Sequence, residues 1–351
     1  MNHTFWKDKK VFLTGHTGFK GSWMSLWLST LGAKVKGFAL APNTEPALFK
    51  LAGLERLIDS EIGNINQYDS ILKAMRASEP EVLFHLAAQP LVRESYNNPI
   101  ENYMSNVMGT VHVLEAARHI PSLKSIVVIT TDKCYENKEW VWPYRENEPM
   151  GGYDPYSASK ACAELVMASY RNSFFDTQKI GVATARAGNV IGGGDFSVDR
   201  LIPDFIRAIQ KNETVNLRYP NAIRPWQHVL ESLHGYLVLA EKLWNQPQEF
   251  SEAWNFGPYS QDAKTVAQIV EALISGFGQG AWQQDPGQHP HEAHYLKLDI
   301  QKAETHLDWH PVLNINEALT MIVDWYQALR GNQDMLQFTV NQIQTFSRRC
   351  S

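Results

Sequence analysis

The sequence predicts an α/β protein that is built on a doubly wound parallel sheet. Short apolar runs, typical of buried strands, alternate with segments of helical periodicity between residues 11 and 186. A turn with three regularly spaced glycines follows the first of these runs. Apolar residues make up 44% of the 351 positions, which supports a packed core and disfavours disorder. A chain of this length has room for a sheet domain and a smaller second domain.

The individual elements follow from the spacing of apolar side chains. A strand is expected where a run is apolar throughout or alternates with polar residues, and a helix where apolar residues recur three and four positions apart. The crossovers between parallel strands should be right-handed. We expect strands at 11–14, 34–39, 57–62, 82–88, 125–130 and 180–186, and helices at 22–31, 67–77, 99–118 and 156–174.

Glycines and prolines interrupt this pattern after residue 186. We expect Gly188 and the triplet Gly192-Gly193-Gly194 to form a flexible segment, and later prolines to divide the chain into shorter pieces. A helix at 226–242 and a short strand at 254–257 should return to the sheet. The expected domains are 1–186 with 226–257 for the first, and 187–225 with 258–351 for a smaller, mixed α/β domain.

The glycine turn indicates a nucleotide-binding site. Gly15, Gly18 and Gly21 are spaced three residues apart, directly after an apolar strand and at the start of a helix. Glycine permits tight turns and a close approach of backbone to ligand, and a helix N-terminus attracts phosphate. The turn therefore predicts a Rossmann-type dinucleotide-binding domain. The strand at 34–39 lacks the acidic residue that often holds the adenosine ribose, so the sequence leaves that contact open.

Composition excludes several classes of function. The net charge is −5 without a long block of like charge, so nucleic acid is not an expected partner. Cys134, Cys162 and Cys350 are odd in number and show no CxxC spacing, which disfavours a disulfide framework and fits a reducing compartment. The first residues lack the apolar core of a signal peptide, and no run reaches the roughly 18 apolar residues of a membrane span. We therefore expect a cytoplasmic protein.

Three histidines late in the chain are the remaining candidate metal ligands. His289, His291 and His294 are irregularly spaced in a proline-containing stretch, and no cysteine joins them. A solvated or substrate-facing loop accounts for them better than a metal site. We therefore expect no metal ion.

A tyrosine and a lysine form the second signature of the sequence. Tyr156 and Lys160 are four residues apart at the start of a predicted helix, so they share one face of it. The ammonium group can lower the pKa of the phenol and hold a ribose. A deprotonated tyrosine can then take a proton from a hydroxyl group as a hydride leaves the same carbon.

The motifs together resemble the extended short-chain dehydrogenase/reductase family. Besides the glycine turn and the Tyr-Lys pair, they include His85-Leu86-Ala87-Ala88-Gln89 on one strand and Thr131-Asp132-Lys133 after another. The Thr-Asp pair is similar to that of the nucleotide-sugar 4,6-dehydratases, and the lysine after it resembles the branch that acts on CDP-glucose. The resemblance implies NAD-dependent conversion of CDP-glucose to CDP-4-keto-6-deoxyglucose. The implied steps are oxidation at C-4, loss of water across C-5 and C-6, and return of the hydride to C-6, in deoxysugar synthesis for surface polysaccharide such as O-antigen.

The same resemblance assigns roles to five residues. Tyr156 is the expected base for the sugar 4-hydroxyl, with Lys160 beside it, and Thr131 is expected to bind the 4-oxygen. Asp132 can protonate the departing water if burial raises its pKa. Lys133 stands where the dTDP-glucose enzymes carry a carboxylate base. It either handles the C-5 proton or pairs with Asp132, and the sequence leaves both possibilities open.

Cofactor and substrate contacts are also implied by the resemblance. No arginine suited to a 2′-phosphate follows the second strand, which favours NAD over NADP. Substrate contacts are expected from Asn189, Leu201 and Arg224, the last of them at the pyrophosphate. Cofactor contacts are expected from Thr14, Gly15, Thr17, Gly18, Phe19, Lys20, Gly21, Asn64, Ile65, Leu86, Ala87, Gln89, Asn106, Tyr156 and Lys160.

The resemblance further implies a homodimer in which the helices at 99–118 and 156–174 pair with those of a second copy as a four-helix bundle. Two other enzyme functions stay open, a 4,6-dehydratase of another nucleotide sugar and a nucleotide-sugar 4-epimerase. Epimerases usually lack an acid after the fifth strand, so Asp132 disfavours the second of these. A non-enzymatic dinucleotide-sensing scaffold would have no need for the set Thr131, Tyr156 and Lys160.

Overall fold

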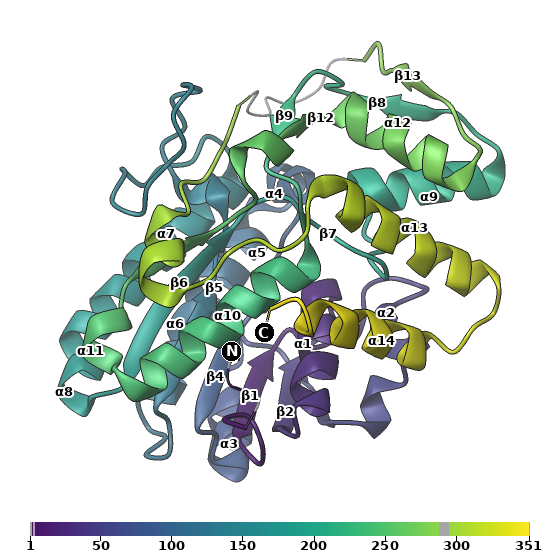
Figure 1. The fold of residues 1–351 in the computed structure, drawn as a ribbon. Coiled ribbons are helices and arrows are strands. Elements are labelled where there is room, and N and C mark those ends of the chain that lie inside the picture. Colours follow the sequence, from purple (N-terminus) through teal and green to yellow (C-terminus); the bar gives the residue numbers. More distant parts are fainter. Residues whose placement is uncertain (1, 3, 288–294, 351) are drawn as a thin grey trace.

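The core of the protein is a seven-stranded parallel sheet with helices on both faces, as the sequence predicts (Figure 1). The computed structural model describes residues 2, 4–287 and 295–350. The strand order is β11-β6-β5-β4-β1-β2-β3, and every pair in this sheet is parallel. The strands are β1 (Lys10–Thr14), β2 (Lys34–Ala39), β3 (Asp59–Ile62), β4 (Val82–His85), β5 (Ser125–Ile129), β6 (Gly181–Ala187) and β11 (Ala253–Phe256).

The two faces of the sheet bury alternate side chains of each strand. On β1, Val11 and Leu13 belong to one hydrophobic core and Phe12 to the other, as the two-residue repeat of a strand requires. The first core also holds Trp23 and Trp27 of α1, which are fully buried packing residues. The helices of the sheet domain include α1 (Phe19–Thr30), α3 (Tyr68–Ser78), α4 (Val92–Asn97), α5 (Pro99–Tyr103), α6 (Gly109–Ala117), α7 (Pro155–Tyr170) and α10 (Val229–Asn245).

Local sequence signals account for several helix ends. Asp154 caps α7 by accepting a hydrogen bond from the Ser157 N–H group, and Pro155 occupies its first turn. The helix expected at 99–118 is divided by a π-helical turn, η2 (Met104–Met108), into α5 and α6. The helix expected from residue 226 begins only at Val229, because β10 (Gln227–His228) first pairs with β7 (Val190–Ile191).

Apart from the short helices at 176–178 and 247–250, which precede β6 and β11, the remaining elements lie beyond the carboxyl ends of the sheet strands and along one of its faces (Figure 1). Trp27 of α1 packs edge-on against Phe346 of the last helix, with ring centroids 5.7 Å apart. The small strands form three pairs, β10-β7, β12-β9 and β13-β8. Their bounds and those of the helices are β8 (Val215–Leu217), β9 (Ile223–Arg224), β12 (Lys264–Thr265), β13 (Trp282–Gln284), α2 (Leu48–Leu51), α8 (Asp176–Gln178), α9 (Leu201–Lys211), α11 (Pro247–Phe250), α12 (Val266–Phe277), α13 (Ile315–Arg330) and α14 (Met335–Ser347).

The expectation of a flexible glycine segment after β6 is wrong. Gly192, Gly193 and Gly194 are buried, and a Cβ atom at Gly193 would lie 2.1 Å from the indole ring of Trp325. The indole N–H group of Trp23 donates to the Gly193 carbonyl oxygen at 2.9 Å. Glycine is needed here because two tryptophans approach the backbone, so the segment is fixed between α1 and α13.

Within residues 2, 4–287 and 295–350, no helix has both the length and the apolar character needed to cross a bilayer.

Candidate active site

The glycine turn joins β1 to α1 at the carboxyl edge of the sheet. Gly15 has a φ angle of +77°, and a Cβ atom there would lie 2.7 Å from the Ala87 nitrogen. A Cβ atom at Gly21 would lie 2.0 Å from the Gly15 carbonyl oxygen. Gly18 caps α1 without a side chain and is exposed, so the first N–H groups of the helix have no side-chain cap. This turn leaves a concave backbone with free donors, which fits the pyrophosphate of a dinucleotide such as NAD.

Thr14 links the start of the glycine turn to the end of β4 through hydrogen bonds. Its hydroxyl group lies 2.7 Å from Nδ1 of His85 and accepts hydrogen bonds from the N–H groups of Leu86 and Ala87. The other ring nitrogen of His85 lies 3.1 Å from the hydroxyl of Thr110. Because Thr14 is fully buried and these contacts occupy its hydroxyl group, we infer that it supports the cofactor loop rather than contacting the cofactor.

His16 packs over Gly37 of β2 and reaches Ser60 of β3, a position that the sequence does not reveal. A Cβ atom at Gly37 would lie 2.4 Å from the His16 ring, so the glycine within β2 makes room for the imidazole. Nε2 of His16 lies 2.7 Å from the Ser60 hydroxyl oxygen. Burial, followed by the charge of Lys36, lowers the pKa of His16 to about 4, so this imidazole is neutral.

The other residues of the turn point in different directions. Thr17 donates its hydroxyl hydrogen to the Leu40 carbonyl oxygen at 2.8 Å, which ties the turn to the end of β2. Phe19 packs towards Gly192. Lys20 lies near Asp132 and Lys160, whose charges act on it, and its Nζ atom lies 3.4 Å from the Tyr236 hydroxyl oxygen.

The other predicted cofactor residues lie along the loops after β3 and β4. Asn64 accepts a hydrogen bond from the N–H group of Asn66, and Ile65 is buried against Gly109 of α6. Gln89 and Asn106 are joined by two hydrogen bonds: the Gln89 N–H donates to Oδ1 of Asn106, and Nδ2 of Asn106 donates to the Gln89 carbonyl oxygen. Asn106 also donates to the Ser159 hydroxyl oxygen at 2.9 Å, so it braces this loop against α7.

The candidate acid lies directly after β5. Thr131 and Asp132 begin a short 3-10 turn, and the Thr131 hydroxyl donates to Oδ1 of Asp132 at 3.0 Å. Oδ2 of Asp132 is buried and has no hydrogen-bond partner among the residues that the structure describes, and it lies 2.5 Å from the position of a Cβ atom on Gly188. Burial raises the pKa of Asp132, although Lys133, Thr131 and Arg224 oppose it. A buried carboxyl group with a raised pKa is suited to donate a proton.

The candidate base lies on the first turn of α7. Contrary to the expectation that Lys160 lowers the pKa of this phenol, burial raises the pKa of Tyr156 to about 12, while the Thr131 hydroxyl group and Arg200 act to lower it. Lys160, one helical turn further on, donates to the Ile129 carbonyl oxygen at 3.2 Å. Burial lowers the pKa of Lys160 to about 8. Tyr156, Lys160 and the β5 terminus therefore meet in one buried cluster.

Lys133 is half-buried beside this cluster. Its backbone N–H group donates to the Thr131 hydroxyl oxygen at 3.4 Å. In the part of the chain that the structure describes, no ion pair joins its ammonium group to Asp132. The charge of Lys133 nevertheless acts on Asp132 and opposes the rise of its pKa, so the two side chains lie near each other.

Three cationic side chains lie close to this buried cluster. Arg224 of β9 is buried, lowers the pKa of Asp132, and therefore faces that carboxyl group. Arg200 binds Asp195 at 2.9 Å and faces both Tyr156 and Lys20. Burial, with Arg200 and Lys160, lowers the pKa of Lys20 to about 7. This concentration of positive charge suits a diphosphate in a chain of net charge −5.

Asn189 and Leu201 are the other two predicted substrate residues. Asn189 lies between Gly188 and β7, and its carbonyl oxygen accepts a hydrogen bond from the Gln227 N–H group at 3.1 Å. Leu201 is the first residue of α9, directly after Arg200. Sequence reasoning missed Arg200 and the inward position of Lys20. The sequence signal that could have identified Arg200 is its position as a charged residue directly before a helix.

The described residues contain no group of three or more His, Cys, Asp or Glu side chains close enough to hold a metal ion. His289, His291 and His294 lie outside the described residues.

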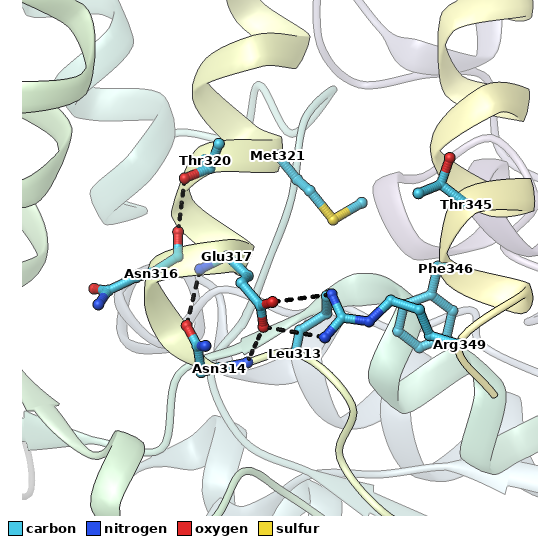
Figure 2. Close-up of a pocket in the computed structure, with 9 residues that line it drawn as sticks. All are labelled: Leu313, Asn314, Asn316, Glu317, Thr320, Met321, Thr345, Phe346 and Arg349. Atoms are coloured by element: carbon cyan, nitrogen blue, oxygen red, sulfur yellow. Dashed lines mark hydrogen bonds and ion pairs between the residues drawn. The ribbon is translucent and has the colours of Figure 1, made fainter.

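A separate cavity of about 400 Å³ lies between α13 and α14 (Figure 2). Glu317 and Arg349 form an ion pair across it, with Oε1 and Nη1 3.1 Å apart. The cavity is lined by α13, by the two residues before α13, by α14 and by Arg349. The lining includes none of the predicted site residues.

Comparison with known proteins identifies the family of this chain. The family model for GDP-mannose 4,6 dehydratase matches residues 12–322. The chain is 53% identical to CDP-glucose 4,6-dehydratase of Salmonella typhimurium over 352 residues, which covers 99% of this chain and 98% of that protein. It is 28% identical to dTDP-glucose 4,6-dehydratase of Streptomyces antibioticus over 259 residues, 72% of each.

Solved structures share the fold at 21% identity. UDP-glucose 4-epimerase from Thermotoga maritima superimposes with a TM-score of 0.79 and covers 91% of this chain and 99% of that one. The dTDP-glucose 4,6-dehydratase from Streptomyces venezuelae, solved with NAD bound, gives 0.78 and covers 93% and 99%. With the family match across most of the chain, the conclusion is that this protein belongs to the GDP-mannose 4,6-dehydratase family of extended short-chain dehydrogenases/reductases.

Proposed function

We propose that the protein is an NAD-dependent CDP-glucose 4,6-dehydratase, which converts CDP-glucose to CDP-4-keto-6-deoxyglucose. The observation that carries this proposal is the meeting of Tyr156, Lys160, Thr131 and Asp132 at one end of the sheet, where a buried carboxyl oxygen of Asp132 has no hydrogen-bond partner among the described residues. The full-length similarity to the Salmonella typhimurium enzyme supports CDP-glucose as the substrate.

The protein side chains divide the oxidation and the elimination between them. NAD, when bound at the glycine turn, supplies a reversible hydride acceptor. Tyr156 takes the proton of the sugar 4-hydroxyl, and the Thr131 hydroxyl holds the 4-oxygen. The resulting ketone acidifies the proton at C-5, so a base can remove it. Asp132 donates its proton to the 6-hydroxyl, which leaves as water. Arg224 and Arg200 hold the diphosphate and keep the sugar over these groups.

The base at C-5 is assigned to Lys133. Lys133→Ala should slow the wash-in of solvent deuterium at C-5 of the product by about 100-fold, in the range of lost general-base catalysis. Nuclear magnetic resonance of the product in deuterated water measures this rate. Lys138→Ala, at an exposed lysine in the following loop, is the matched control. Unchanged exchange in Lys133→Ala would assign the base to another group or to water.

A homodimer through α5, η2 and α7 is part of the proposal. These elements lie together, and they expose apolar side chains that a second copy would cover. Ile100 is 81% exposed and Leu165 is 61% exposed. Three further side chains on α5 and η2 are exposed as well: Tyr103, Met104 and Met108.

The double variant Ile100→Glu, Leu165→Glu should therefore convert the dimer to a monomer, because it places four carboxylates in the apolar interface. Light scattering coupled to size-exclusion chromatography gives the mass. Leu57→Glu changes an exposed leucine elsewhere and should leave the dimer intact. A dimer that persists in the double variant would place the interface on another surface.

The proposed cellular role is synthesis of deoxysugars for surface polysaccharide such as O-antigen, in the cytoplasm. A 4-epimerase is disfavoured, because epimerisation needs no proton donor at C-6, whereas the raised pKa of the buried Asp132 suits that residue to donate a proton.

A substrate panel tests the proposed function. Purified protein with NAD should convert CDP-glucose faster than dTDP-, GDP- or UDP-glucose, giving a product that is lighter by one water. Faster conversion of another sugar nucleotide would overturn the CDP assignment, and an isomer of unchanged mass would indicate an epimerase.

A further inference from the structure

Glu164 and Arg186 form a buried ion pair near the proposed catalytic residues. The proposed reaction steps do not involve this ion pair. Glu164 is one helical turn beyond Lys160 on α7, and Arg186 is on β6. Nη2 of Arg186 lies 2.7 Å from Oε2 of Glu164, and Nε donates to Oε1 at 3.0 Å. Both side chains are about 95% buried, with exposed fractions of 4% and 5%. The two-point geometry fixes the carboxylate plane.

Two threonine hydroxyl groups complete the contacts of the carboxylate. Thr130 donates to Oε1 of Glu164, and Thr184 donates to Oε2 at 2.8 Å. Thr130 directly precedes Thr131, so this contact fastens the end of β5 to α7. Burial alone would raise the pKa of Glu164, but Arg186 and the two hydroxyl groups lower it overall. The carboxylate is therefore ionised.

Arg186 extends the network to the other side of the catalytic segment. Its Nη1 atom donates to the Tyr135 hydroxyl oxygen at 2.8 Å and to the Glu146 carbonyl oxygen at 3.0 Å. Tyr135 donates in turn to Oδ1 of Asn255 on β11 at 2.7 Å. Residues 131–133 are therefore held at both ends, by Thr130 before them and by Tyr135 after them.

We propose that Glu164 is a positioning residue of the active site, whose fixed carboxylate stabilises the charged form of Lys160 and holds the 131–133 segment against α7. This inference rests on the proposed function, because it takes Lys160 as the cationic partner of the catalytic tyrosine. Glu164 itself does not touch the reacting atoms.

The charges around Lys160 identify Glu164 as the relevant anion. Titratable groups face Lys160 from four elements: Glu164 on α7, Cys134 after β5, His85 on β4 and Lys20 on α1. Burial raises the pKa of Cys134 and lowers the pKa of His85 to about 3, so both are neutral. The pKa of Lys20 is about 7, so Lys20 is largely neutral at the pH where Lys160 loses its proton. Glu164 thus supplies the negative charge that keeps Lys160 an ammonium ion.

The test is the pH dependence of Glu164→Gln, which keeps the shape of the side chain and removes its charge. In the wild type, activity and NAD affinity should fall as Lys160 loses its proton near pH 8. Without the carboxylate the pKa of Lys160 falls further, so both alkaline limbs should move to lower pH by about one unit or more. NAD affinity is measured by tryptophan fluorescence, and kcat/KM by conversion of CDP-glucose.

Thr184→Val is the matched control, because it removes one hydrogen bond to Glu164 and keeps the charge. The alkaline limbs of Thr184→Val should coincide with those of the wild type. Lys20 titrates in all of these proteins, so the effect of Lys20 cancels.

If Glu164→Gln does not fold, the double variant Glu164→Gln, Arg186→Gln removes the unpaired guanidinium. The alkaline limbs of the double variant should move in the same direction as those expected for Glu164→Gln. Limbs that coincide in all variants would overturn the inference. A wild type that does not convert CDP-glucose would instead overturn the proposed function, while the NAD titration would still test Glu164.

Discussion

Replacing Tyr156 with phenylalanine should lower kcat by about 10²–10⁴-fold, the range for loss of a general base. The change removes one hydroxyl group and leaves the buried ring in place. CDP-glucose should therefore still bind with a similar dissociation constant, while conversion nearly stops. Steady-state kinetics and isothermal titration with CDP-glucose measure the two effects separately.

Tyr170→Phe is the control for this experiment, because Tyr170 ends the same helix and bonds to Glu115, at 3.2 Å, away from the site. Its kcat should stay within about twofold of wild type. If Tyr156→Phe kept most of its activity, proton removal from the 4-hydroxyl would need another base.

Asp132→Asn should separate the two halves of the reaction. The carboxamide is similar in shape to a protonated carboxyl group but is not an acid, so loss of water from C-6 should slow by about 10²–10³-fold. Oxidation at C-4 depends on Tyr156 and should continue. Solvent deuterium should therefore still enter at C-5, while the 6-deoxy product forms slowly.

The readout for Asp132→Asn is the ratio of C-5 exchange to product formation, which mass spectrometry gives in one sample. Asp176→Asn, at a surface aspartate of α8, should keep the wild-type ratio. A variant in which both rates fall equally would show that Asp132 acts before elimination.

Local signals in the sequence predict the sheet and the positions of Tyr156 and Lys160. Strand β2 has the predicted bounds, and the glycine turn lies between β1 and α1 as expected. The position of Tyr156 and Lys160 follows from helical spacing alone once Asp154 and Pro155 fix the start of α7. These features depend on neighbours a few residues away, which a single sequence displays.

Features that depend on distant neighbours could not be predicted in the same way. Gly193 looked flexible because its partners, Trp23 and Trp325, lie far from it in sequence. The sequence predicts Lys20 as a cofactor contact but does not show that its side chain lies beside Tyr236 on α10. The Glu164–Arg186 pair spans α7 and β6, and neither residue alone marks it as part of the site.

The most direct test of the proposed function uses CDP-glucose with deuterium at C-4. The proposed function requires that the hydrogen leaving C-4 returns to C-6 of the same sugar. The purified protein should therefore give a 4-keto-6-deoxy product that carries the deuterium at C-6, even when unlabelled NADH is added in excess. A product without deuterium at C-6, or an isomer of unchanged mass in which the sugar keeps its deuterium at C-4, would contradict the proposed function.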